Sequence, residues 1–297
     1  MSGPTLRDIP GVRVGHATDS VARTGCTVVL VTDGAVAGMD VRGSAPGTRE
    51  ASLLTPTALV ERIHAIVLAG GSAFGLAAAD GVMRWLAERD IGFETPARRV
   101  PIVPAAVLYD FGVGNPFAAP TPEMGYAACE AAVAGDGTLE GPVGAGAGAT
   151  VGKLGGIERA VPSGIGAAGR MGGDYRVAAL AAVNAIGNLI GPDGRLIAGS
   201  PVEVPEPSPG NTTLGVLATD APLDRAQCRK LAELGHDALA LAISPVHTMF
   251  DGDVVFALST APPGADRLGP AEFTRLGMAS VDALREAILR SVERPEN

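Results

Sequence analysis

The amino-acid sequence predicts an α+β protein with a large hydrophobic core. Hydrophobic residues make up 46% of the 297-residue chain and charged residues 19%, which excludes a disordered protein. The predicted strands and helices alternate irregularly, and many of the strands look antiparallel. This order does not fit a doubly wound parallel sheet, in which the two kinds of element alternate regularly.

The individual elements follow from hydrophobic periodicity and from the turn residues between them. Asp33 and Gly34 separate two strand-like runs, so we expect them to form a hairpin turn. Three segments have helical periodicity: 76–89, 123–134 and 224–242. The runs with the length and composition of strands are 11–16, 26–31, 34–39, 63–69, 100–107, 214–219 and 254–259.

Two glycine-rich stretches raise the question of a phosphate site. Residues 70–75 lie between a strand and a helix, as phosphate-binding loops do, but lack the Gly-x-Gly spacing of the dinucleotide fingerprint. We interpret them as close helix–strand packing, with a phosphate site as the alternative. Residues 141–153 resemble a nucleotide-binding loop, but Ala147 replaces a required glycine and Leu154 a required hydroxyl residue. What remains is one lysine, Lys153, in a glycine-dense segment.

Composition excludes several kinds of partner. The formal net charge of −9 and the lack of a basic run argue against nucleic acid. The three cysteines are far apart and the four histidines are scattered, so we expect no disulfide framework, no metal site and no cofactor. The N-terminus lacks the apolar core of a signal peptide, and no apolar run reaches the roughly 20 residues that span a bilayer. These features predict a soluble, cytoplasmic protein with no membrane partner.

The most informative stretch is the boundary between a proline-rich and glutamate-rich segment, 200–210, and the strand-like run after it. The composition of this segment predicts an exposed linker. The run opens with Asn211, Thr212 and Thr213. Cleavage of the Asn211–Thr212 bond would give Thr212 a free α-amine, with an ordinary pKa of about 7.7–8.0, that could activate its own hydroxyl. The alternative is that these residues simply begin a strand.

Three polar residues elsewhere are candidates for the same site. Asn184 is the single polar side chain in the apolar part of residues 176–186, and is either a structural bridge or a donor to a substrate carbonyl. Asp251 and Asp253 stand two residues apart at the start of a strand, so their side chains point to the same side. A glycine turn flanked by aspartates is the alternative.

Taken together, several segments resemble the β-aminopeptidase and L-aminopeptidase/D-esterase family, in its nylon-oligomer hydrolase branch. The resemblance implies a four-layer α/β/β/α sandwich of the N-terminal-nucleophile-hydrolase type, built from residues 1–297 as a single domain. It also implies self-cleavage into an α chain, 1–211, and a β chain, 212–297, and assembly of four αβ units. The similar segments, in family order, are 11–16, 42–48, 68–76, 148–153, 218–223 and the strand 254–259.

The resemblance also implies the nucleophile and its immediate partners. Counted back from residues 218–220, the nucleophile is Thr212, and the cut falls between Asn211 and Thr212. By the same resemblance, Asp251 and Asp253 orient the amine and the hydroxyl of this threonine.

Further site residues are implied around the nucleophile. Lys153 and Asn184 complete the polar site, with Asn188 as the alternative to Asn184, and Tyr109 lies over the substrate. The Asn184 side-chain amide would serve as an oxyanion donor. Lys153 would lower the pKa of the Thr212 amine by like-charge repulsion, whereas the aspartates would oppose that effect.

These inferences predict an N-terminal-threonine amidohydrolase, acting on small peptides or on ω-amino-acid oligomers such as those of 6-aminohexanoate. Three alternatives remain: an exopeptidase of the β-aminopeptidase or D-esterase type, an acyltransferase of the N-acetylornithine type, and an unprocessed binding protein. Two smaller fragments on a denaturing gel would argue against the last of these.

Overall fold

The computed structural model describes residues 3–135, 137–201 and 209–292, so most of the predicted linker lies outside the described residues. Its main sheet has nine strands in the order β3-β5-β4-β2-β14-β12-β9-β8, with β1 paired to β2. The strands are β1 Arg13–Asp19, β2 Thr24–Val41, β3 Gly47–Arg49, β4 Arg62–Ala69, β5 Ala105–Val107, β8 Ile165–Gly172, β9 Tyr175–Asn184, β12 Thr212–Thr219 and β14 Val254–Ser259.

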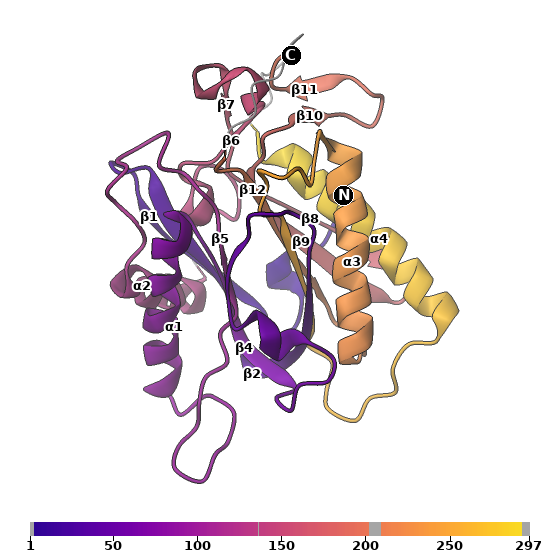
Figure 1. Ribbon diagram of the computed structural model, residues 1–297. Coiled ribbons are helices and arrows are strands. Elements are labelled where there is room, and N and C mark those ends of the chain that lie inside the picture. Colours follow the sequence, from indigo (N-terminus) through magenta and orange to yellow (C-terminus); the bar gives the residue numbers. More distant parts are fainter. Residues whose placement is uncertain (1–2, 136, 202–208, 293–297) are drawn as a thin grey trace.

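Four α-helices cover the strands, two on each side (Figure 1). Helices α1, Ala78–Ala87, and α2, Pro122–Ala134, lie on one side; α3, Arg225–Ala242, and α4, Pro270–Arg290, lie on the other. Two small sheets pair β10 Asn188–Ile190 with β11 Leu196–Ala198 and β13 Ile243–Ser244, and β6 Thr150–Val151 with β7 Val161–Pro162. The 3₁₀ helices are Leu6–Asp8, Ala51–Leu54, Ser72–Ala77, Gly144–Gly146, Lys153–Gly155 and Ile157–Arg159.

Three separate core clusters show that the strands form two layers. Val28 of β2 packs in a cluster with α1 and α2, whereas Val29, on the opposite face, packs in an interior cluster that includes no residue of the four described α-helices. In β14, Phe256 belongs to that interior cluster and Val255 to the cluster under α3 and α4. Alternate residues of a strand point to opposite faces, so each strand layer lies between the interior core and a helix layer. This is the predicted four-layer α/β/β/α sandwich.

The long strand β2 joins the two strand layers and corrects one prediction. The hairpin at Asp33 and Gly34 is wrong, because β2 runs continuously through these residues and its pairing with β4 shifts register between Leu30 and Ala35. Gly34 has a φ of 78°. A positive φ is needed both in a hairpin turn and in a bulge that contains a left-handed residue, so glycine suits either structure. The dipeptide therefore marks a bulge within one strand.

The glycines at residues 70–75 serve close packing, as expected, and no room for a phosphate is left at their start. Asp110 places one carboxylate oxygen 2.8 Å from the Gly71 N–H, and a Cβ at Gly70 would lie 2.0 Å from the other. Thr24 donates to the same carboxylate over 2.7 Å. Burial raises the pKa of Asp110, and these hydrogen bonds oppose that rise. A carboxylate of the protein thus occupies the anion position.

Among the helices described, none is long and apolar enough to cross a membrane.

Candidate active site

The predicted site lies where three strands of the main sheet end together. Strand β12 begins at Thr212, which stands opposite Asn184, the last residue of the antiparallel β9. Strand β14 runs parallel to β12 on its other side and begins just after Asp253. Thr212, Asn184 and Asp253 are all buried, with at most 5% of their surface exposed. The sheet topology therefore brings together residues that are far apart in the sequence.

Two donors converge on the carbonyl group of the bond that the sequence predicts to be cut. The Thr212 hydroxyl donates to the Asn211 carbonyl oxygen over 2.5 Å, and the Gly252 N–H donates to the same oxygen over 2.8 Å. A Cβ at Gly252 would lie 2.8 Å from Thr212 Oγ1 and 2.6 Å from the Ala45 oxygen. Only glycine fits at residue 252, between the Thr212 hydroxyl and the main chain of Ala45.

The loop that follows β2 contacts residues 251–253 on the side away from Thr212. The main-chain N–H of Arg42 donates to the main-chain carbonyl oxygen of Asp253 over 3.1 Å, and the main-chain N–H of Ala45 donates to that of Asp251 over 2.9 Å. A Cβ at Gly43 would lie 2.3 Å from the main-chain carbonyl oxygen of Asp251, so the two main chains are in close contact here. The loop between β2 and β3 thus fixes the position of the Asp-Gly-Asp segment.

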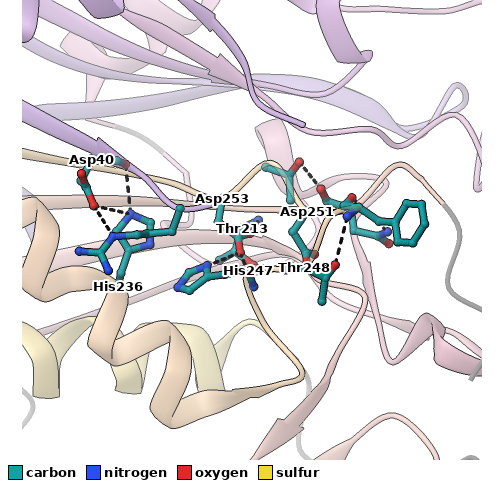
Figure 2. Close-up of polar contacts among 11 residues, drawn as sticks. Asp40, Thr213, His236, His247, Thr248, Asp251 and Asp253 are labelled. Atoms are coloured by element: carbon teal, nitrogen blue, oxygen red, sulfur yellow. Dashed lines mark hydrogen bonds and ion pairs between the residues drawn. The ribbon is translucent and has the colours of Figure 1, made fainter. Parts of the chain in front are cut away.

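Within the described residues, neither aspartate side chain hydrogen-bonds to Thr212 in the uncut chain. Asp253 accepts the Thr213 N–H on Oδ1 over 2.7 Å, and the Nδ1 of His247 on Oδ2 over 2.7 Å (Figure 2). Asp251 accepts the main-chain N–H and the hydroxyl of Thr248 on Oδ2, over 2.8 and 2.6 Å (Figure 2). The predicted contact of these carboxylates with Thr212 is therefore indirect while residues 211 and 212 are joined.

His247 and Thr248 were not predicted as site residues. The sequence did carry one signal for Thr248, because a hydroxyl residue three positions before an aspartate often closes a turn through the aspartate side chain. The signal for His247 is weaker, since its contact with Asp253 depends on a left-handed backbone, with a φ of 56°.

Lys153 and Asn184, both candidate site residues, lie together. Lys153 Nζ donates to Asn184 Oδ1 over 2.8 Å and to the Asn184 carbonyl oxygen over 2.9 Å. The Asn184 side-chain amide donates to the Tyr109 carbonyl oxygen over 2.7 Å and to the Gly210 carbonyl oxygen over 3.3 Å. The alternative, Asn188, instead exchanges two hydrogen bonds with the main chain of Ser200. Of the two asparagines, Asn184 is the one next to Thr212.

Burial makes Lys153 a titratable group near neutral pH. Loss of solvation lowers the pKa of its amine from 10.5 to about 7, and the charge of Asp251 opposes the shift. Burial also raises the pKa of Asp251, with the Asp253 charge acting in the same direction. The two shifts leave the site with an amine that changes charge in the physiological range. Within the described residues, no three histidine, cysteine or acidic side chains are grouped as metal ligands.

The shifted pKa of Lys153 predicts a pH dependence of stability. The unfolded chain holds the proton up to about pH 10.4, so the free energy of unfolding rises between pH 7 and that value, by about 2 kcal/mol from pH 7 to 9. We expect uncut Thr212→Ala protein to show this rise in urea unfolding, and the added change Lys153→Met to remove it. An unchanged pH dependence would contradict a buried amine that loses its charge near pH 7.

Tyr109 lies beside the segment that leads to the predicted cut. Tyr109 is 43% exposed, and its ring packs on Gly210, where a Cβ would lie 2.6 Å from the ring. Phe111 stands edge-on to Tyr109 at 5.2 Å between ring centroids, and Phe74 lies 6.4 Å beyond Phe111. These three rings, which we call the aromatic wall, give the site an apolar and partly exposed side.

Comparison with known proteins identifies the family of this chain. The family model described as peptidase family S58 matches residues 5–297. An uncharacterized aminopeptidase of Mycobacterium tuberculosis, Rv1333, is 41% identical, covering 97% of this chain and 93% of its own. A 6-aminohexanoate-oligomer endohydrolase of Kocuria sp. is 32% identical, over 97% of this chain and 86% of its own.

A solved structure supports the fold independently. The L-aminopeptidase D-Ala-esterase/amidase of Ochrobactrum anthropi, described as a variant of the Ntn hydrolase fold, superposes with a TM-score of 0.76. The match covers 98% of this chain and 86% of that one, at 19% identity. The chain therefore belongs to peptidase family S58 and is a hydrolase of amide bonds.

Proposed function

We propose that this hydrolase cuts its own chain between Asn211 and Thr212 and then uses Thr212 as an N-terminal nucleophile. Residues 1–211 and 212–297 would remain together as α and β chains of one domain. The observation that carries the proposal is the convergence of the Thr212 hydroxyl and the Gly252 N–H on the Asn211 carbonyl oxygen, at 2.5 and 2.8 Å. The first contact supports Thr212 as the nucleophile, because its hydroxyl lies against this carbonyl group, and the second would polarise the group.

The self-cleavage step needs no external reactant until its last stage. Thr212 Oγ1 bonds to the Asn211 carbonyl carbon, and the Gly252 N–H holds the negative charge that develops on the oxygen. The bond from this carbon to the Thr212 nitrogen then breaks, and the hydroxyl proton ends on that nitrogen. The product is an ester with a free amine, and water hydrolyses the ester to release the Asn211 carboxylate.

The mature enzyme would repeat this chemistry on a substrate. The Thr212 amine takes the hydroxyl proton while Oγ1 attacks the substrate carbonyl, and the leaving amine receives the proton. Departure of Gly210 would free one N–H of Asn184, which then serves as an oxyanion donor. Lys153, held on the far side of Asn184, keeps this side chain oriented and its charge disfavours protonation of the Thr212 amine.

Removal of the Asn184 amide should therefore slow catalysis strongly. We expect Asn184→Ala to lower kcat about 10²- to 10³-fold, the usual effect of losing one oxyanion donor. Asn188→Ala is the matched control, because that asparagine hydrogen-bonds to Ser200, and it should retain kcat. Both would be measured on fully cut protein. Equal losses in the two variants would contradict the assignment of Asn184.

The substrate class we propose is short peptides and ω-amino-acid amides, including 6-aminohexanoate oligomers. The relatives named as an aminopeptidase and as a 6-aminohexanoate-oligomer endohydrolase support this class, and the aromatic wall offers an apolar surface for a hydrocarbon segment. The test is a panel of L-aminoacyl p-nitroanilides, β-peptides and 6-aminohexanoate oligomers. Turnover of at least one class is expected, and cut protein that hydrolyses none of them would contradict it.

Periodate offers a direct test of the nucleophile. It oxidises an N-terminal threonine, whose amine and hydroxyl are on adjacent carbons, to an aldehyde. We expect periodate to abolish amidase activity and to place an aldehyde on the 212–297 chain. Full activity after complete oxidation of that chain would rule out the Thr212 amine as the base.

We also propose, from the family resemblance, that the protein is cytoplasmic and that four αβ units assemble. Light scattering of the cut protein tests the second point, and a mass of one αβ unit would contradict it.

A further inference from the structure

A histidine that the proposed mechanism does not use lies directly behind the nucleophile strand. Two donors of His247, the ring Nδ1 and the main-chain N–H, bind Asp253 Oδ2 over 2.7 and 3.2 Å. The other oxygen, Asp253 Oδ1, accepts the Thr213 N–H over 2.7 Å (Figure 2). A carboxylate oxygen only accepts, so His247 Nδ1 carries the proton in this contact. One carboxylate thus joins the histidine to the residue after the nucleophile.

The surroundings of His247 hold its ring in the orientation that this contact needs. The ring of His236 packs edge-on against it, at 4.8 Å between centroids, and His236 Nε2 lies 3.1 Å from the Asp40 carbonyl oxygen. Within the described residues, His247 Nε2 is buried and has no hydrogen-bond partner. The contact with Asp253 is therefore the one polar contact of the ring there. A φ of 56° is compatible with few residue types besides glycine, asparagine, aspartate and histidine.

We propose that His247 is a positioning residue for self-cleavage. It holds the buried Asp253 carboxylate so that Oδ1 faces the Thr213 N–H, and this fixes the first residues of β12 with Thr212 Oγ1 against the Asn211 carbonyl. Without the ring donor, Asp253 can turn away from Thr213, and the nucleophile loses its alignment. The proposal rests on the proposed function of Thr212.

Four substitutions separate the donor from the backbone conformation. In His247→Asn the amide nitrogen stands the same number of bonds from Cα as Nδ1 does, and asparagine tolerates a positive φ. His247→Gly tolerates the same φ but has no donor. His247→Gln carries its donor one bond too far out, and His247→Ala lacks both properties. We expect cleavage of newly translated chains to be within about threefold of wild type for Asn, and about 10- to 100-fold slower for the other three.

The matched control is His64→Ala. His64 is a buried histidine whose Nδ1 also has one hydrogen-bond partner, the main-chain N–H of Ile102, but it lies on β4. Cleavage of this variant should follow the wild-type time course. Glycine at 247 restoring the wild-type rate would show that the backbone conformation alone matters and would overturn the proposal. Asparagine as slow as alanine would also overturn it.

Hydrogen exchange tests the positioning separately from the chemistry. In an uncut Thr212→Ala background, His247→Ala should speed exchange of the Thr213 amide at least tenfold, and His247→Asn should restore protection. Unchanged protection in His247→Ala would overturn the proposal even if wild-type protein cuts itself. If His247→Ala alters the protection as expected but the wild-type chain never cuts itself, the proposed function of Thr212 is overturned. A role of His247 in self-cleavage is then overturned with it.

Discussion

Replacing Thr212 by alanine is expected to leave a single 29.8 kDa chain with no measurable amidase activity. The variant lacks the hydroxyl that donates to the Asn211 carbonyl oxygen over 2.5 Å, so neither self-cleavage nor attack on a substrate has a nucleophile. Thr212→Ser keeps a hydroxyl at this position and should still cut itself. Denaturing gels and hydrolysis of an aminoacyl p-nitroanilide measure the two effects.

The neighbouring threonine is the matched control for this substitution. The Thr213 hydroxyl is buried and has no hydrogen-bond partner in the part of the chain that the structure describes. Thr213→Val keeps the shape of the side chain and the main-chain N–H that binds Asp253. We expect this variant to cut itself and to remain active. Activity in Thr212→Ala, or an uncut Thr213→Val chain, would place the nucleophile elsewhere.

Replacing Lys153 by methionine is the second change for which we expect a large effect. The substitution keeps most of the buried side-chain volume but removes the donor to both oxygens of Asn184. Asn184 Oδ1 then keeps the Thr150 N–H as a donor, over 3.1 Å, but loses the one from Lys153. Under the proposed mechanism, the like charge that lowers the pKa of the Thr212 amine is also removed. We expect kcat to fall about 10²- to 10⁴-fold, the range typical of a lost acid–base group.

The protein has one other lysine, which makes the control simple. Lys230 lies on α3, with 57% of its side chain exposed and an ion pair to Glu233. Such a surface pair contributes about 0–1 kcal/mol, so Lys230→Met should leave kcat and stability nearly unchanged. A Lys153→Met enzyme as fast as Lys230→Met would remove Lys153 from the site.

Much of the fold follows from local patterns in the sequence. The strands at β4, β12 and β14 and the helix α3 were placed to within a few residues, because their apolar runs are bounded by clear turn or capping residues. Strand β8 and helix α4 were not predicted. Residues 165–172 contain three glycines, which weaken a strand pattern. The bulge at Gly34 depends on pairing with β4, which no local pattern encodes.

The candidate site was predictable as a set of residues but not as an arrangement. Thr212, Asn184 and Lys153 come together because β9 and β12 pair in one register, which the sequence does not specify on its own. The resemblance implies that the aspartates orient the amine and the hydroxyl of Thr212. Their actual partners lie one residue further along β12 and in the loop before β14, because the Thr212 hydroxyl is already held by the Asn211 carbonyl.

The central claim is that the chain cuts itself at one bond, and intact mass of the purified wild-type protein under denaturing conditions tests it most directly. The account predicts two chains, residues 1–211 and 212–297, with Thr212 as the first residue of the second. A single uncut chain that hydrolyses amide substrates would contradict it, because Thr212 would then have no free amine to act as the base.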